Sequence, residues 1–163
     1  MTKRASKSFT TTVFVFSALL IAFALIHSSM PAGVSDGESI GIAEYLTSFF
    51  KSIGVNIEIT NHFLRKAAHF TEYTAMGMLF TLCAYSFNRL QPYRYAPQVL
   101  FAGLLTAVAD ETVQLFADGR AGMLEDVWLD FAGVITGFAL MLIFCLLIVR
   151  RRKKHEFGNK KGK

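Results

Sequence analysis

The chain has 163 residues, 53% of them hydrophobic, and a formal net charge of +5. This apolar content exceeds what a soluble domain of this length needs for its core, so the excess should face lipid. The positive charge does not indicate nucleic acid, because eight of the seventeen Lys and Arg residues lie in the tail 150–163, directly after a long apolar run. Such a tail is typical of a last transmembrane helix that ends at cytoplasmic headgroups. We therefore expect a cell-membrane protein whose partner is the lipid bilayer, with no nucleic acid.

The first apolar segment, 10–27, follows a basic start and contains no charged residue. Its length suits one membrane-spanning helix. The residues after it lack a clear small-x-small cleavage pattern. We therefore expect this segment to remain in the protein as a helix.

Residues 28–61 form the one long connection. Pro, Gly and acidic residues in 31–38 predict an irregular start. Further along, apolar residues recur at steps of three and four, which predicts a short amphipathic helix lying in the outer membrane interface. This apolar stripe consists of Ile42, Tyr45, Leu46, Phe49, Phe50 and Ile53.

Three more segments, 67–87, 97–116 and 127–149, each have about the 20 residues that cross a bilayer. The predicted fold is therefore an all-α bundle of four transmembrane helices, forming a single domain over 1–163. Thirteen basic residues fall on the side of the two termini and four on the other. This asymmetry predicts a multi-pass protein with both termini cytoplasmic.

The last three spans carry their polar residues at what this topology makes their extracellular ends. Charges that face lipid are costly, so these side chains should face one another inside the bundle. The candidate catalytic or organising residues are His69, Glu72, Asp110, Glu111, Asp126 and Asp130. The candidate ligand-binding residues are Arg65, Lys66, Tyr73, Gln114 and Arg120.

This set contains the groups needed for acid–base chemistry on a phosphate. His69 and Glu72 lie one helical turn apart and suit proton transfer, while Arg65 and Arg120 suit bidentate phosphate binding. We expect no Ser, Cys or Thr nucleophile in the cluster. A metal site is chemically feasible although ordinary zinc spacing is missing, and no cofactor is assigned. Its ligands would be His69, Glu72, Glu111 and Asp130.

The order of these motifs resembles the VanZ-like family of bacterial membrane proteins over roughly 60–140. The resemblance rests on RKAAHFTEY at 65–73, DETVQLF at 110–116, Gly119-Arg120, and 126–130 with Gly133. It implies a small multi-span protein of the Gram-positive cell envelope, associated with resistance to the glycopeptide teicoplanin, and it implies no particular mechanism. Family members commonly carry a proline where this chain has Asp118.

Three functional hypotheses follow. The first is a VanZ-like protein that binds or acts on an anionic lipid-linked molecule at the outer leaflet, such as a polyprenyl phosphate or cell-wall lipid, and lowers susceptibility to glycopeptides. The second is a membrane hydrolase or transferase of such lipids. The third is a structural or partner-binding protein without a ligand, in which the polar cluster only locks the helices together. Gly133 and Gly137 are interpreted as sites of close helix packing.

Overall fold

The computed structural model describes residues 4–54, 56 and 59–161. Within these residues the chain is helical and contains no strand, which confirms the all-α prediction. The elements are α1 (Lys7–Ser28), α2 (Ala32–Ser52), α3 (Asn61–Phe87), the short 3-10 helix η1 (Pro92–Tyr95), α4 (Ala96–Gln114) and α5 (Leu124–Lys161).

Hydroxyl side chains set where two of the helices begin. The Phe9 amide donates a hydrogen bond of 3.2 Å to Oγ of Ser6, before α1, and the Phe63 amide donates one of 3.2 Å to Oγ1 of Thr60, before α3. Each bond satisfies a backbone N–H that has no partner within its helix. The Thr60 cap starts α3 six residues before the predicted span at 67, so the helix extends beyond its apolar part.

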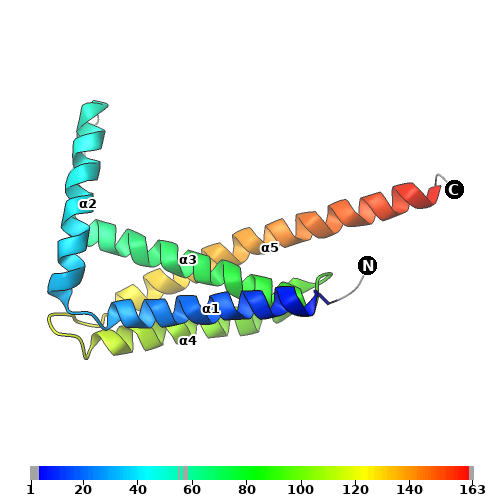
Figure 1. Ribbon diagram of the computed structural model, residues 1–163, viewed down its shortest axis with the longest axis horizontal. Helices are drawn as coiled ribbons and strands as arrows, with labels where there is room; N and C mark the ends of the chain where they lie inside the picture. The colour runs from blue at the N-terminus through cyan, green and yellow to red at the C-terminus, as the bar shows by residue number, and fades with distance from the viewer. Residues whose placement is uncertain (1–3, 55, 57–58, 162–163) are drawn as a thin grey trace.

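The helix α3 lies at the centre of a bundle with α1, α4 and α5 (Figure 1). Both chain ends lie at one end of this bundle, while α2 and the connection from α4 to α5 lie at the other. The buried apolar core runs between the four helices. It includes Ala24, Tyr73, Met76, Phe80, Ala84, Val99, Ala107, Val127 and Val134.

Glycines allow α3 and α5 to approach backbone to backbone. A Cβ atom at Gly133 would meet the carbonyl oxygen of Phe70, and one at Gly137 would meet that of Thr74. Only a residue without a side chain fits at such a distance. The interpretation of Gly133 and Gly137 as packing residues is therefore confirmed.

Two of the described helices are long and apolar enough to cross a membrane: α1 and the part of α5 over Leu124–Arg152. Only 17% and 28% of their apolar windows are buried, unlike the core helices of a soluble protein. They support two of the four predicted spans and indicate a membrane protein. The other two predicted spans do not pass the same test, because α3 and α4 carry the polar residues of the candidate site.

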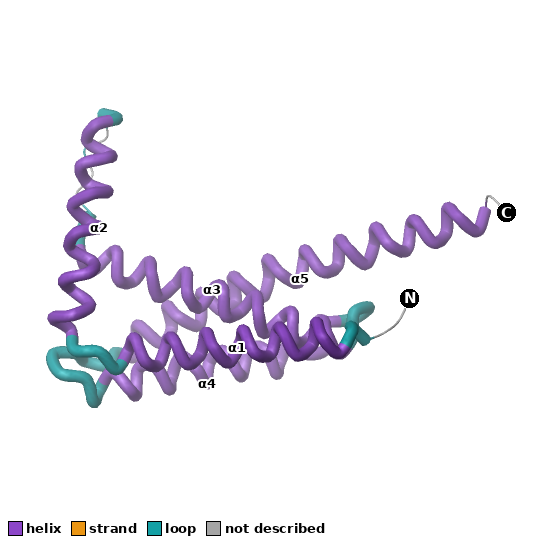
Figure 2. Tube along the Cα trace, in the orientation of Figure 1, coloured by secondary structure: helices purple, strands orange, loops and turns teal. Residues whose placement is uncertain are grey.

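The helix α2 corrects two expectations about the long connection. The predicted helix in this connection is present, but it has 21 residues and begins directly after Pro31, so the predicted irregular start at 31–38 and the predicted short length are both wrong. Proline is compatible with a helix start, because a backbone N–H there needs no partner within the helix. Figures 1 and 2 show α2 at one end of the bundle, with its axis at a steep angle to the axes of the other helices. Its apolar side chains are exposed, including Ile42 at 53%, Tyr45 at 71% and Phe49 at 50%.

Candidate functional site

Three helix ends bring a histidine and two aspartates together. The Nδ1 atom of His69, near the start of α3, lies 3.9 Å from Oδ2 of Asp110 and 3.8 Å from Oδ1 of Asp130. One ligand atom from each residue lies within 4.8 Å of the others. These separations are too long for direct hydrogen bonds. The three groups therefore surround a common point without bonding one another, and we call them the polar centre.

Asp110 is held on one side by neutral donors. Ser28 Oγ, at the end of α1, donates a hydrogen bond of 2.8 Å to Asp110 Oδ2, and Gln114 Nε2 donates one of 3.3 Å to the same oxygen. The second oxygen, Oδ1, is buried and accepts no hydrogen bond within the described residues. Asp110 is thus fixed in orientation with one oxygen still available.

Asp130 has fewer hydrogen-bond donors around its carboxylate than Asp110 has. Its side chain is 1% exposed, and neither carboxylate oxygen accepts a hydrogen bond within the described part of the chain. A buried carboxylate normally has donors around it, because its desolvation is costly. His69 Nδ1 lies 3.8 Å from Asp130 Oδ1.

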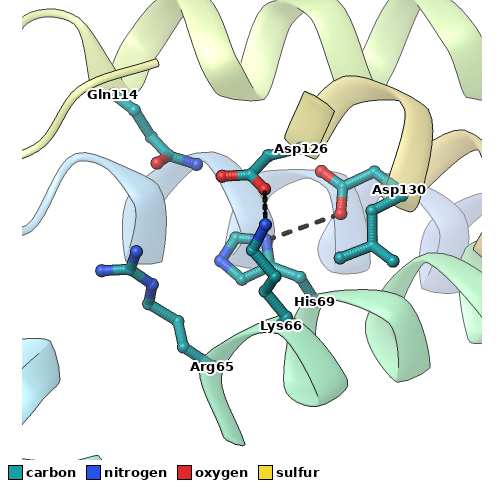
Figure 3. A pocket seen from close by; sticks show the side chains of 7 residues that line it. Arg65, Lys66, His69, Gln114, Asp126 and Asp130 are labelled. Carbon is teal, nitrogen blue, oxygen red and sulfur yellow. Dashed lines mark ion pairs between the residues drawn. The ribbon is translucent and has the colours of Figure 1, made fainter. Parts of the chain in front are cut away.

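A narrow cavity opens beside the polar centre, shown in Figure 3. Its volume is about 10 Å³, which is room for roughly one water molecule. A phosphate group therefore cannot enter it without rearrangement. The lining residues are Arg65, Lys66, His69, Gln114, Asp126, Leu129 and Asp130.

One ion pair closes part of the cavity mouth. Lys66 Nζ lies 2.9 Å from Oδ1 of Asp126, and both side chains remain partly exposed, at 31% and 19%. The hydrogen bond to Asp126 raises the pKa of Lys66 above its ordinary value. Lys66 is therefore a cation at neutral pH that is already engaged by an acid.

Arg120 is positioned by a tight turn after α4. The Arg120 amide donates a hydrogen bond of 3.1 Å to the carbonyl of Ala117, and Gly119 adopts a φ of +74° within this turn. Glycine suits that conformation because it has no Cβ. Arg120 is half-buried, and its positive charge acts on both His69 and Asp110.

Glu111 lies outside the polar centre, and both of its carboxylate oxygens accept hydrogen bonds. It is 5% exposed, its Oε1 accepts a hydrogen bond of 3.0 Å from Gln114 Nε2, and its Oε2 accepts one of 2.9 Å from the Met123 amide. It does not line the cavity. Glu111 thus ties the end of α4 to the segment that leads into α5, and Gln114 links it to Asp110.

Two predicted residues of α3 also lie outside the cavity. Tyr73 is fully buried between α3 and α4, where its hydroxyl donates a hydrogen bond of 3.4 Å to the Thr106 carbonyl. Glu72 is half-buried, and its Oε1 accepts no hydrogen bond within the described residues. Both residues follow His69 on the same helix without lining the cavity.

Nothing in the sequence pattern indicated that Ser28 belongs to this site. Ser28 is 1% exposed and its hydroxyl contacts Asp110, so the expectation that no hydroxyl adjoins the cluster is wrong. Ser28 and Ser29 both follow an apolar run, as polar residues commonly do at the end of a helix. The sequence pattern therefore did not distinguish Ser28 as a site residue. Only the packing of α1 against α4 shows that Ser28, and not Ser29, contacts Asp110.

The helices, their exposed apolar surfaces and the buried polar centre together define an all-helical membrane protein with a polar site between its helices. The VanZ/LLP1 family matches residues 13–146, and the chain belongs to this family. No curated protein and no solved structure matches the chain significantly. Family membership confirms the resemblance drawn from the motifs.

Proposed function

We propose that this protein is a single-domain, four-span envelope protein that binds an anionic, phosphate-bearing lipid at the outer leaflet. The additional spans are α3 and α4. The outer side of α4 is apolar, with Phe101 at 68% and Leu105 at 58% exposed, whereas Asp110 on the same helix is fully buried. A helix with this division suits lipid on one side and a polar bundle interior on the other.

The steep angle of α2 supports this placement. With the bundle along the membrane normal, α2 lies in the membrane plane, where its exposed apolar side chains enter the interface. The same placement puts the polar centre near the membrane surface that carries α2. The distribution of basic residues makes this the outer surface.

The observation that carries the proposal is a basic rim over a polar cavity. Arg65 and Lys66 line the mouth of the cavity whose deeper walls contain His69 and Asp130, and Arg120 lies near the same centre. Guanidinium and ammonium groups bind phosphate oxygens strongly. Because the cavity holds only about one water molecule, the headgroup sits at the rim and its apolar chain stays in the bilayer.

One observation favours the second hypothesis, an enzyme that acts on such lipids. His69 lies between two carboxylates and Ser28 contacts one of them, so the site contains groups for proton transfer. Catalysis would change the bound lipid, whereas a binding protein would release it unchanged. Turnover therefore distinguishes these two functions.

Lipid binding is tested with the detergent-purified protein and undecaprenyl phosphate, with undecaprenol as the uncharged comparison. We expect native mass spectrometry to detect the phosphorylated lipid on the wild type and a large loss of it in Arg65→Gln and Arg120→Gln. Arg94→Gln is the matched control, because Arg94 is exposed in η1 at the other end of the bundle. Equal retention of both lipids, or equal binding by all variants, contradicts the proposal.

Two further measurements separate the remaining hypotheses. Release of inorganic phosphate from the bound lipid would identify an enzyme, and unchanged lipid would identify a binder. Teicoplanin susceptibility is then compared in a sensitive Gram-positive host that expresses wild type or Arg120→Gln at matched protein levels. If the cluster has only a structural role, Arg120→Gln lowers the melting temperature and abundance instead of lipid binding.

A further inference from the structure

The polar centre contains more negative charge than its own basic residues balance. Its two aspartates are accompanied by one histidine, and Lys66, which lines the adjoining cavity, is already paired with Asp126. An anionic headgroup at the rim would add to this excess. A cation deeper in the site would offset this excess.

The least satisfied group is Asp130, which lies at the bottom of this arrangement. Its side chain is 1% exposed, accepts no hydrogen bond within the described residues and points toward His69 (Figure 3). Asp110 likewise keeps Oδ1 buried and without a hydrogen bond there, while Ser28 and Gln114 hold Oδ2. Carboxylates with this pattern are typical of metal ligands, whose neighbours orient one oxygen and leave the other for the ion.

From this geometry we propose that His69, Asp110 and Asp130 bind one divalent cation of the Zn²⁺ or Mn²⁺ class. Ligand atoms on a tetrahedral zinc ion lie about 3.4 Å apart at bond lengths of about 2.1 Å. His69 Nδ1 lies 3.8 Å from Asp130 Oδ1 and 3.9 Å from Asp110 Oδ2, which is slightly longer. Oδ2 is the oxygen that Ser28 and Gln114 hold, so a rotation of the Asp110 carboxylate would turn its other oxygen, Oδ1, toward the ion.

The donor types select the class of metal. One imidazole and two carboxylates suit zinc and manganese, whereas Ca²⁺ requires six to eight oxygen ligands. The site contains no thiolate, because Cys83 and Cys145 lie elsewhere in the bundle. Three protein ligands leave a coordination position open, and the cavity beside it has room for one water molecule or one phosphate oxygen. The inference rests on the proposed function only for the identity of that fourth ligand.

The test measures metal alone, without lipid, on the full-length protein in detergent with any affinity tag removed. The protein is stripped with EDTA, loaded with ZnCl₂ or MnCl₂, desalted and analysed by inductively coupled plasma mass spectrometry. We expect about one ion per chain for the wild type and a loss of about tenfold or more in Asp130→Asn and His69→Gln. Asp118→Asn is the matched control, because Asp118 is exposed in the connection after α4 and lies outside the polar centre.

Melting temperature, measured with and without added metal, provides a second readout. It detects binding even when the metal is lost during desalting. Metal should raise the melting temperature of the wild type and of Asp118→Asn, but not that of Asp130→Asn. Without metal, Asp130→Asn should melt at or above the wild type, because asparagine keeps the shape of the side chain and removes a buried charge. This variant is therefore expected to fold.

The outcomes separate this inference from the proposed function. A wild type that retains no more metal than Asp130→Asn, or a metal-dependent rise in melting temperature that is equal in both, overturns the metal site. If the wild type retains no more metal than Asp130→Asn while both bind undecaprenyl phosphate equally well, the metal site fails and lipid binding stands. One ion per chain in a protein that retains no phosphorylated lipid supports the metal site and rejects the proposed function.

Discussion

Ser28, the last residue of α1, donates a hydrogen bond of 2.8 Å to Oδ2 of Asp110 near the end of α4. The two residues are 82 positions apart in the sequence, so this bond joins two helices that do not follow each other along the chain. Both side chains are buried, at 1% and 0% exposure. The bond therefore connects the first helix directly to the polar centre.

Replacing Ser28 by alanine should lower the free energy of unfolding by about 1–3 kcal/mol, because a hydrogen bond to a buried charged acceptor is lost. Ser29→Ala is the matched control. Ser29 is exposed and its hydroxyl donates only to the Ile26 carbonyl of its own helix, so this change should cost about 0.5 kcal/mol or less. Denaturant titration in detergent measures both. Equal effects of the two substitutions would show that the contact with Asp110 adds no stability.

Gly137→Ala should destabilise the bundle by about 1–3 kcal/mol, because its new methyl group meets the backbone carbonyl of Thr74, which cannot move aside without shifting α3. Gly41→Ala adds the same methyl group to α2, where nothing lies within 4 Å. The control should be neutral or more stable by up to about 1 kcal/mol, because alanine is the better helix former. Thermal unfolding of the purified variants checks this, and a loss of similar size at both positions would contradict it.

Glu111→Gln should loosen the segment between α4 and α5. Glutamine offers only one acceptor oxygen, whereas Glu111 accepts hydrogen bonds from both Gln114 and the Met123 amide. Loss of a bond to a charged acceptor corresponds to about tenfold or more faster hydrogen exchange at Met123. Asp118→Asn, an exposed acid in the same connection, should leave that exchange unchanged. If the Met123 amide is equally protected from hydrogen exchange in Glu111→Gln, Glu111 does not hold the end of α4 against the segment that leads into α5.

The ion pair of Lys66 with Asp126 should stabilise the protein at neutral pH and lose this effect in alkali. Asp126 raises the pKa of Lys66 in the folded protein. A group of this kind stabilises the fold fully below its unfolded-state pKa of about 10.4, and the contribution disappears as the pH rises through the higher folded-state value. The difference in melting temperature between wild type and Lys66→Met should therefore be small, constant from about pH 7 to about pH 9, and lost as the pH rises through the raised pKa of Lys66.

The Asp126→Asn background provides the control for this pH dependence. In that background Lys66→Met should have a much smaller pH-dependent effect, because the partner that contributes most to the raised pKa of Lys66 has been removed. A difference that grows as the pH rises, in either background, has the wrong sign for this ion pair.

The proposed four-span topology predicts which connections reach the outside. In a chain whose own cysteines are replaced by alanine, Lys51→Cys in α2 should react with a membrane-impermeant maleimide in intact cells. Gln91→Cys, between α3 and η1, should react only after the cells are opened. Both positions are exposed in the structure, so access to the reagent depends on the side of the membrane. Labelling of position 91 and protection of position 51 would invert the orientation and place the polar centre at the inner surface.

Much of the helical framework and the polar character of the site could be read from the sequence. Apolar runs predicted α1 and the apolar part of α5, and steps of three and four placed His69 and Asp130 each on one face of its helix, because side chains at that spacing project in the same direction. Gly133 and Gly137 on one face of α5 predicted close helix packing, and the structure shows that the partner is α3. The start of α2 was missed, because proline and glycine indicate turns but also occur in the first turn of a helix.

The tertiary structure alone decided which polar residues meet. Asp110 and Glu111 are adjacent in the sequence, yet Asp110 joins His69 and Asp130 while Glu111 binds the backbone of Met123. Helical periodicity specifies the direction of a side chain around its own axis, but not the rotation and axial offset of that helix against its neighbours. The glycine contacts between α3 and α5 and the turn at Gly119 determine those quantities. For the same physical reason, the sequence identified an acid-rich cluster, and only the packing of α1 showed that Ser28 contacts it.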